Sequence, residues 1–493
     1  MRSRRPIRVL FVDLNNYARF PTLAVGYLVA SLRQAGVEVE VLTPLSYGMP
    51  ATEREGRETW QDALRRRAYL TTHPVSQRIQ PWARDAYVGW KQRPHSVVVK
   101  QTTAALTERT PDVLLLSAYL DHHPSVQALG SIAADLGVPV VLGGPAFNQE
   151  ATARTWLEVS GLTAIVGAES DHSLPDLIAA VVRREELISF PGVLLPDGRS
   201  GPEPTPLRDL AGLPIPDFSD FPWERYPNRI LPVMTGRGCE WGRCIFCSDV
   251  TSVNGRTFRS RPPPEVLDEL TTNSGRHAVL DAVFLDIKLN SDLEMWRTIL
   301  EHYQRCMPGG SWIGTVHVGR GENGLSREEM AAAAASGMRR VSFGLETGSQ
   351  RLNDRMAKGT DLDGMSRFIH AAYDAGISIR TTMMSGYPGE TSDDIDQTTR
   401  FLALHERQID RVRLSRFKAI PGTRFQELYD TGKGSFPGIS SLDWNPRLGR
   451  ANYVYGPASS RQYRRAKARL LRAVHQINRK PLRDGAEQFD GLM

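Results

Sequence analysis

The stretch Gly236-Arg237-Gly238-Cys239-Glu240-Trp241-Gly242-Arg243-Cys244-Ile245-Phe246-Cys247 gathers three of the four cysteines of this 493-residue chain. Three thiolates can bind three irons of a four-iron cluster and leave the fourth iron open to another ligand, whereas an electron-transfer cluster uses four cysteines. The pattern therefore indicates a catalytic 4Fe-4S cluster, with glycines that let the backbone approach the cluster sulfurs. Zinc is the alternative, but Cys306 lies far downstream and His277 has no partner at ligand spacing.

Composition indicates a globular chain of two or three domains, because 493 residues exceed one core. No run of eighteen apolar residues is present, so no membrane span is expected. Asp13 and Asn15 interrupt the first apolar stretch, which favours a strand over a signal peptide. Cluster thiolates need a reducing compartment, so we expect a cytoplasmic protein. A net charge of +6 is modest for this length and indicates no nucleic-acid partner.

Residues 1–190 alternate apolar strand patterns with helical ones, which predicts an α/β, doubly wound (Rossmann-like) domain with a parallel sheet. Residues 51–108 are polar and Arg-rich and resemble a helical insertion. The expected strands are Ile7–Asp13, Val37–Leu42, Val113–Ser117, Val138–Gly143 and Thr163–Val166, and the expected helices include Leu23–Gly36 and Ser125–Leu136.

Ligands of such sheets bind at the carboxyl ends of the strands. Polar or Gly-rich residues follow the strands there, which makes these exits candidate binding residues. They are Leu14, Ser117, Gly143, Gly144, Gly167 and Glu169.

Residues 191–228 combine a small hairpin with the Pro-rich linker Leu213–Phe218. A second strand–helix series occupies residues 229–430 and predicts a partial (β/α)6 barrel, whose site lies at the strand carboxyl ends. Its expected strands are Arg229–Thr235, Ala282–Asp286, Trp312–His317, Arg340–Leu345, Ile377–Ser385 and Val412–Phe417. Residues 431–493 form a turn-rich segment and a basic helix. The cysteine stretch directly follows the first barrel strand.

Further motifs follow in a fixed order after the cysteines. They are Phe284-Leu285-Asp286, Gly344-Leu345-Glu346-Thr347-Gly348-Ser349, Met356-Ala357-Lys358-Gly359, Gly386-Tyr387-Pro388-Gly389-Glu390 and Ile420-Pro421-Gly422-Thr423. Together they resemble the radical S-adenosylmethionine (SAM) superfamily. The amino-terminal region and its linker resemble the cobalamin-binding domain that precedes many such barrels. The gap between Cys239 and Cys244 holds four residues, where the familiar signature holds three, and is closest to enzymes that modify natural products and peptides.

The resemblance implies a role for each matched residue. Cys239, Cys244 and Cys247 ligate the cluster, whose open iron is chelated by SAM. The implied SAM-binding residues are Phe246, Asp286, Gly344, Glu346, Lys358, Gly386 and Pro388. The simpler interpretation of Glu346 and Lys358 is a surface ion pair.

For cobalamin, the sequence departs from the Asp-x-His-x-x-Gly pattern that supplies a histidine to cobalt. The first strand exit contains no histidine, and Asp121-His122-His123 follows a later strand, where a polar loop is expected. Two alternatives remain: cobalamin bound without a histidine ligand, or an inherited fold that no longer binds it.

The resemblance implies a C-methyltransferase that acts on an unactivated carbon of a small-molecule or peptide substrate, with electrons from a ferredoxin- or flavodoxin-type donor. The alternatives are cobalamin-associated rearrangement or cyclisation without methyl transfer, and a non-catalytic cluster- or corrinoid-binding sensor. Methylthiotransferases need cysteines for a second cluster, and Cys306 alone does not supply them.

The segment Arg461–Lys480 carries eight Lys and Arg residues and no acid. A solvated amphipathic helix face is the first interpretation. Binding of a leader peptide or a phosphate group is the second.

Overall fold

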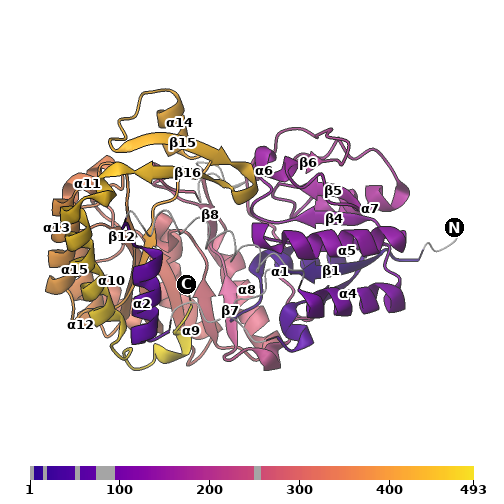
Figure 1. Cartoon of the computed structure of the whole chain (residues 1–493). Coiled ribbons are helices and arrows are strands. Elements are labelled where there is room, and N and C mark those ends of the chain that lie inside the picture. The colour runs from indigo at the N-terminus through magenta and orange to yellow at the C-terminus, as the bar shows by residue number, and fades with distance from the viewer. Residues whose placement is uncertain (1–4, 15–18, 50–55, 74–94, 249–256, 493) are drawn as a thin grey trace.

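The computed structural model describes residues 5–14, 19–49, 56–73, 95–248 and 257–492 and contains two α/β domains side by side (Figure 1). The parallel sheet of each domain supplies one wall of the space between them. In the described part of the chain, no helix is long and apolar enough to cross a membrane.

The amino-terminal domain is a six-stranded sheet in the order β2-β1-β3-β4-β5-β6, with β6 antiparallel to β5 at the edge. Its strands are β1 (Arg8–Asp13), β2 (Glu38–Leu42), β3 (Val113–Ser117), β4 (Val140–Gly143), β5 (Leu162–Val166) and β6 (Val193–Leu194). Helices α1 (Leu23–Gln34) and α7 (Leu174–Arg183) pack on one face. Helices α4 (Ser96–Arg109), α5 (His123–Asp135) and α6 (Glu150–Arg154) pack on the other. Because both faces are covered, the strands are almost wholly apolar.

The predicted insertion at residues 51–108 is divided between the two domains. Helix α4 covers the amino-terminal sheet, so it belongs to the doubly wound layer and not to an insertion. Helix α2 (Trp60–Tyr69) instead lies against the second domain, where the Arg416 guanidinium donates to Tyr69 O at 2.9 Å (Figure 1). Part of this stretch, residues 74–94, lies outside the described residues.

The linker between the domains is buried. The small hairpin predicted near residue 193 is present, because Gly201 N–H donates to Val193 O at 2.8 Å. Phe218 is fully buried against α1, and a Cβ on Gly26 of that helix would lie 2.4 Å from its ring. The linker therefore packs between the two domains.

The second domain is the predicted open barrel, a parallel sheet in the order β14-β13-β12-β11-β10-β7. Its strands are β7 (Ile230–Val233), β10 (Asp281–Phe284), β11 (Trp312–Val316), β12 (Met338–Glu346), β13 (Ser378–Ser385) and β14 (Ile409–Arg416). The helices between them are α8 (Pro263–His277), α9 (Leu293–Cys306), α10 (Arg327–Ala335), α11 (Gln350–Arg355), α12 (Leu362–Asp374) and α13 (Ser392–Leu404). A short antiparallel ribbon, β8 (Gly236–Gly238) with β9 (Phe258–Ser260), flanks the cysteine stretch.

The carboxyl-terminal tail covers the end of the barrel at which the strands begin. Phe489 and Leu492 are buried against Ile230, Val283 and Ile313. The guanidinium of Arg340 donates to Phe489 O at 2.9 Å. The opposite end, where the strands have their carboxyl ends, carries the cysteine stretch.

The remaining carboxyl-terminal elements cover the barrel. They are α14 (Arg424–Asp430), β15 (Ile439–Asn445), β16 (Arg450–Tyr455) and α15 (Arg461–Asn478). The β15–β16 hairpin reaches across to α6, where Thr152 Oγ1 donates to Pro446 O at 3.1 Å (Figure 1). Helix α15 buries one face, which includes Leu470 and Val474, and exposes arginines on the other. The solvated amphipathic interpretation of this basic segment is therefore confirmed.

Buried ion pairs join the two domains beside the β8–β9 ribbon. Arg237 pairs with Asp171 at 2.7 and 2.8 Å, and Arg259 pairs with Glu169 at 2.7 and 3.0 Å. All four side chains are largely buried. The ribbon is thereby fixed to the loop that follows β5.

A second link lies at the base of the ribbon. Arg261 pairs with the wholly buried Glu269 of α8 at 2.7 Å. It also donates to the Tyr27 hydroxyl of α1 at 2.8 Å, and that hydroxyl lies 3.1 Å from Glu269. Breaking a buried pair leaves an uncompensated charge, which commonly destabilises a protein by about 3–5 kcal/mol.

We predict that Glu269→Ala lowers the free energy of unfolding by about 3–5 kcal/mol, because Arg261 is left buried without its carboxylate. The control is Glu158→Ala, which breaks the exposed interdomain pair with Arg447. It is expected to change stability by less than about 1 kcal/mol. Urea unfolding followed by circular dichroism measures both, and equal losses in the two variants would contradict the prediction.

Candidate active site

The cysteine stretch lies at the carboxyl end of β7, between the ribbon and the far side of the barrel. Cys239, Cys244 and Cys247 are not joined in disulfides, and each is half-buried. Cys239 N–H donates to Thr257 O at 3.2 Å. Ile245 N–H donates to Met356 O at 3.0 Å, which ties the stretch to the segment after α11. Burial raises the pKa of Cys244 to about 11, and the nearby ammonium of Lys358 opposes that rise.

The thiols fit a cluster better than a single ion. Among the described residues, no group of three His, Cys, Asp or Glu side chains is placed to hold one metal ion. Each cysteine of a four-iron cluster binds a different iron, so cluster ligands lie farther apart than those of a single ion.

Glu346 and Lys358 form a buried pair beside the cysteines. Lys358 Nζ lies 2.9 Å from Glu346 Oε1, and the two residues are only 8% and 7% exposed, so they are not a surface ion pair. The ammonium also lies 5.8 Å from the centre of the Phe246 ring. The carboxylate of Glu346 and the nearby cysteines raise the pKa of Lys358 against the effect of burial. The motif residues Phe246, Glu346 and Lys358 are thus brought together.

The end of β12 is shaped to create this pair. Glu346 has a φ of +59°, and the pairing of β12 with β13 shifts register between Gly344 and Glu346. A left-handed backbone is costly for a residue with a Cβ and is retained where the surroundings impose it. A Cβ on Gly344 would lie 2.3 Å from Glu346 Oε1 and 2.6 Å from Lys358 Nζ. Glycine at this position therefore leaves room for both charged groups.

The turn after β13 contains Gly386 and Pro388. Gly386 has a φ of +85°, and its N–H donates to the Glu390 carboxylate at 2.7 Å. That bond closes the turn on itself. The conformation needs glycine, because L side chains disfavour this region.

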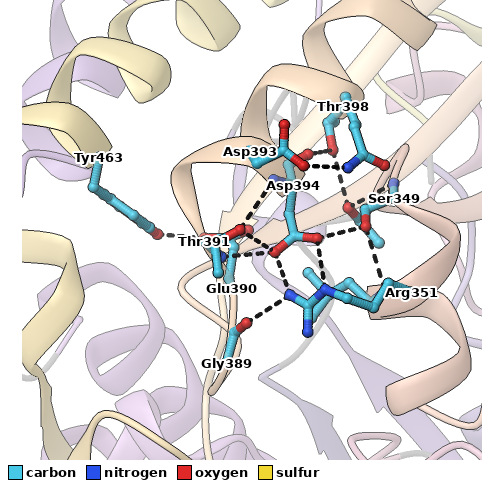
Figure 2. Close-up of polar contacts among 12 residues, drawn as sticks. Ser349, Arg351, Gly389, Glu390, Thr391, Asp393, Asp394, Thr398 and Tyr463 are labelled. Carbon is cyan, nitrogen blue, oxygen red and sulfur yellow. Dashed lines mark hydrogen bonds and ion pairs between the residues drawn. The ribbon is translucent and has the colours of Figure 1, made fainter.

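Asp394 joins this turn to the end of β12 (Figure 2). Its carboxylate accepts from Ser349 Oγ at 2.6 Å and from Thr391 N–H at 2.8 Å, and it pairs with Arg351. Gly348 N–H donates to Thr398 Oγ1 at 2.9 Å. Asp394 and Thr398 were not predicted from the sequence, although Thr391 and Asp394 form a capping box whose pattern is visible there.

A cavity of about 580 Å³ lies between the two domains. The strand exits of the amino-terminal sheet line one side, and Met234, Arg237 and Leu285 of the barrel line the other. Five of the six predicted strand-exit residues line it: Ser117, Gly143, Gly144, Gly167 and Glu169.

Leu14 is the exception and is not among the residues that line the cavity. Its side chain is 2% exposed and packs in the core between the sheet and α4, because the strand turns it away from the cavity. Glu169 lines the cavity, but both its carboxylate oxygens accept from Arg259.

The three glycines at the strand exits differ in how much space a Cβ would have there. A Cβ on Gly144 would lie 2.0 Å from Ala118 O, and one on Gly167 would lie 2.1 Å from Phe147 O. These two are required by backbone packing. A Cβ on Gly143 would meet nothing closer than Val166 O at 3.8 Å, so Gly143 alone of the three keeps space open toward the cavity.

Histidine is absent from the described lining of this cavity. His122 accepts from Tyr119 N–H at 3.0 Å, and the His123 ring packs edge-on against Trp156 at 4.6 Å. The polar loop predicted for Asp121-His122-His123 is instead a 3-10 turn, Leu120–His122, that leads into α5 at His123, and His122 is 7% exposed.

Residues 233–402 match the family model of the radical SAM superfamily. The matched residues run from β7 to α13 and include the cysteine stretch, Glu346 and the turn at Gly386. This barrel is a radical SAM domain.

Curated relatives match the radical SAM domain and part of its surroundings. The anaerobic magnesium-protoporphyrin IX monomethyl ester cyclase of Rubrivivax gelatinosus is 23% identical over 318 residues, which are 60% of this chain and 55% of the relative. The ribosomal protein uS12 methylthiotransferase RimO of Chloroflexus aurantiacus is 30% identical over 205 residues, which are 39% of this chain and 43% of the relative. The chain thus spans about half the length of these relatives.

Solved structures match both domains. The methyltransferase TsrM of Kitasatospora setae, solved with cobalamin and a 4Fe-4S cluster, aligns over 95% of this chain and 91% of its own with a TM-score of 0.64 and 18% identity. The cobalamin-dependent SAM radical enzyme OxsB, solved with aqua-cobalamin, aligns over 91% and 64% with a TM-score of 0.64 and 15% identity. The two-domain fold of this chain is the fold of these proteins.

The gap between Cys239 and Cys244, one residue longer than in the familiar radical SAM signature, contains Trp241. Its indole N–H donates to Ala357 O at 2.9 Å, and its ring stacks on His317 with centroids 6.1 Å apart. A Cβ on Gly359 would lie 2.1 Å from the indole. The longer gap therefore carries a ring that fixes the stretch against the backbone on either side of Lys358.

Asp286, predicted to bind SAM, holds the start of the radical SAM cysteine stretch. It lies two residues beyond β10, and its carboxylate accepts from Thr235 N–H and Oγ1 at 3.1 and 2.7 Å and from Gly236 N–H at 2.9 Å. Burial raises its pKa to about 6. Because these bonds occupy its oxygens, Asp286 holds the backbone at the start of the ribbon in place.

We predict that Gly344→Ala lowers the free energy of unfolding by about 1–3 kcal/mol, because its Cβ forces Glu346 and Lys358 apart. The control is Gly275→Ala in α8, where a Cβ meets nothing within 4 Å. That change is expected to stabilise the helix by about 0.5–1 kcal/mol. Urea unfolding measures both, and a stable Gly344→Ala variant would contradict the tight fit of the pair.

Proposed function

We propose that this chain is a cobalamin-dependent radical SAM enzyme, and that it transfers a methyl group to an unactivated carbon of a natural-product or peptide substrate. The observation that carries the proposal is that the interdomain cavity and the cysteine stretch share the β8 residues Gly236–Gly238. A group bound in that cavity therefore lies next to the residues that lead into Cys239.

Three parts of the site each bind one cofactor. They are the cysteines, the pair of Glu346 and Lys358, and the interdomain cavity. When bound, a three-cysteine 4Fe-4S cluster supplies the electron that cleaves SAM, and a corrinoid supplies a transferable methyl group. Cys239, Cys244 and Cys247 hold the cluster. Glu346 and Lys358 hold charged groups of SAM, since a buried pair can accept and donate charge-assisted hydrogen bonds. Gly386 and Pro388 line the adenosine.

The cavity itself fits a corrinoid. Its lining from the amino-terminal domain is mostly apolar and includes Leu115, Val141 and Val166. Such a lining excludes water and stray reductants from the reacting groups. Because its described lining contains no histidine, we infer that the corrinoid is held by its surroundings and not by a histidine on cobalt.

Methyl transfer is favoured over rearrangement or cyclisation by the extent of the likeness to TsrM, which is named as a methyltransferase and covers almost the whole chain. The relative from Rubrivivax gelatinosus is named as a cyclase, and this keeps cyclisation as the second candidate. A methylthiotransferase activity is disfavoured, because Cys306 is the only cysteine outside the cluster stretch. A small ferredoxin- or flavodoxin-type protein would supply the electron.

We predict that replacing Cys239, Cys244 or Cys247 by Ala abolishes iron binding after anaerobic reconstitution, because a cluster with two protein ligands is lost. Cys306→Ala is the matched control and keeps the iron, since Cys306 lies at the end of α9. Iron and sulfide content with the absorbance of the cluster measures the effect. Loss of iron in all four variants, or in none, would contradict the assignment.

The reconstituted protein is then reduced with SAM present, and S-adenosylhomocysteine and 5′-deoxyadenosine are measured. Both products are expected from the wild-type protein with cobalamin, and neither from the three cysteine variants. The deoxynucleoside without S-adenosylhomocysteine would favour rearrangement or cyclisation. A cluster-loaded protein that forms neither product would contradict the enzyme and favour the sensor.

We predict that Gly143→Phe weakens cobalamin binding about tenfold or more, because its ring fills the cavity and overpacking of this kind commonly costs about 1–3 kcal/mol. Gly143→Ala is the control, since its Cβ meets no atom within 3.4 Å. Bound cobalamin is measured by absorbance after gel filtration. If Gly143→Phe binds as the wild type does, the corrinoid lies elsewhere.

A further inference from the structure

The turn after β13 is covered on its outer side by residues of the carboxyl-terminal region. Residues 233–402 match the radical SAM family model, so this cover lies outside the matched part of the chain. It consists of β16 and the first turns of α15, which packs along α13 (Figure 1).

Tyrosine hydroxyls from this region bond the turn at its carboxyl side. The hydroxyl of Tyr455 donates to Glu390 O at 2.7 Å. The hydroxyl of Tyr463 donates to the Glu390 carboxylate, and its side chain points from α15 directly at that residue (Figure 2). Tyr453 donates to Phe417 O at 3.0 Å, at the end of the neighbouring strand. The backbone and the side chain of Glu390 are thus held by two different elements.

Glu390 connects the tyrosines to Gly386 through its carboxylate. The same oxygen that accepts from Tyr463 accepts from Gly386 N–H at 2.7 Å. Glu390 is 3% exposed, and burial raises the pKa of its carboxyl. A buried carboxylate needs hydrogen bonds or a neighbouring cation.

Lys467, one turn along α15 from Tyr463, is a buried cation in the same region. It is 4% exposed, its ammonium lies 5.9 Å from the centre of the Tyr463 ring, and burial lowers its pKa to about 8 while the charge of Glu390 opposes that shift. A buried lysine is an expensive group to place on a helix that serves only as cover. Its ammonium packs over the ring of Tyr463 and so helps to hold that side chain in place.

We propose that Tyr455 and Tyr463 are positioning residues for SAM, acting through Glu390 on the turn at Gly386. This inference rests on the proposed function, in which that turn lines the adenosine. The carboxyl-terminal helix is accordingly a structural part of the SAM site, and a radical SAM domain cut at residue 402 lacks the groups that fix its fifth-strand turn.

The test is the affinity of the full-length, cluster-loaded protein for SAM, measured anaerobically by equilibrium dialysis. Tyr463→Phe and Tyr455→Phe keep the packing of the ring and remove only the hydroxyl. Each is expected to weaken SAM binding about tenfold, since a hydrogen bond to a charged or buried acceptor contributes roughly 1.5 kcal/mol. Iron content is expected to stay at the wild-type level, because the two hydroxyls bond Glu390 and not the cluster ligands.

Tyr303→Phe is the matched control. Tyr303 is wholly buried in the same barrel, and its hydroxyl lies 2.9 Å from both Leu280 O and Ser311 O, at the amino-terminal ends of β10 and β11, and donates to one of them at a time. Its removal is expected to lower stability by a comparable amount and to leave the affinity for SAM unchanged. The conservative change Glu390→Gln, which keeps an acceptor for Gly386, is expected to bind SAM more tightly than Glu390→Ala.

The outcomes separate this inference from the proposed function. A wild-type protein that carries its cluster and does not bind SAM contradicts the proposed function. A wild-type protein that binds SAM, with Tyr455→Phe and Tyr463→Phe binding equally well, overturns the positioning role. Equal weakening by Tyr303→Phe also overturns it, because the effect would then be one of general stability.

Discussion

The buried pairing of Arg237 and Arg259 with Asp171 and Glu169 is the constraint on which the arrangement of this molecule depends. Both arginines lie on the ribbon that leads into the cysteine stretch, and both carboxylates follow the last parallel strand of the other domain. Moving a charged group out of water costs free energy. Breaking one of these buried pairs would therefore leave an uncompensated charge and destabilise the protein. The position of the cysteines is thereby set relative to the amino-terminal sheet as well as to the barrel.

A cavity with walls from two domains keeps its shape only if the domains hold their distance. Interdomain interfaces are commonly adaptable, and relative motion is the default where the contact is small and polar. Here the linker is buried, and Arg261 ties Tyr27 of α1 to Glu269 of α8. Charged hydrogen bonds are directional, so they fix register where apolar packing alone tolerates sliding. The cavity is therefore a preformed space.

Local patterns in the sequence were enough to predict both sheets and the open barrel. The sequence offered Glu346 and Lys358 only as a surface ion pair, whereas the pair is buried. Strand alternation and Gly-rich exits are local signals, and they locate a site at the carboxyl ends of strands whatever the long-range contacts are. Leu14 packs in the core and not along the cavity, because a strand exit can turn a side chain into the core as readily as toward a ligand. The pairs of Arg237 with Asp171 and Arg259 with Glu169 were missed because their members lie 66 and 90 residues apart, beyond any periodic pattern.

The additional residue between Cys239 and Cys244 lengthens the loop that joins these two cysteines. A longer loop loses more conformational entropy on ordering, so it needs contacts of its own. Trp241 provides them, through its bond to Ala357 O and its stacking on His317. The indole contacts the residues that flank Lys358, and the ribbon at the other end of the stretch contacts the cavity. The longer stretch thus connects the charged pair on β12 and α11 to the interdomain space through one continuous set of contacts.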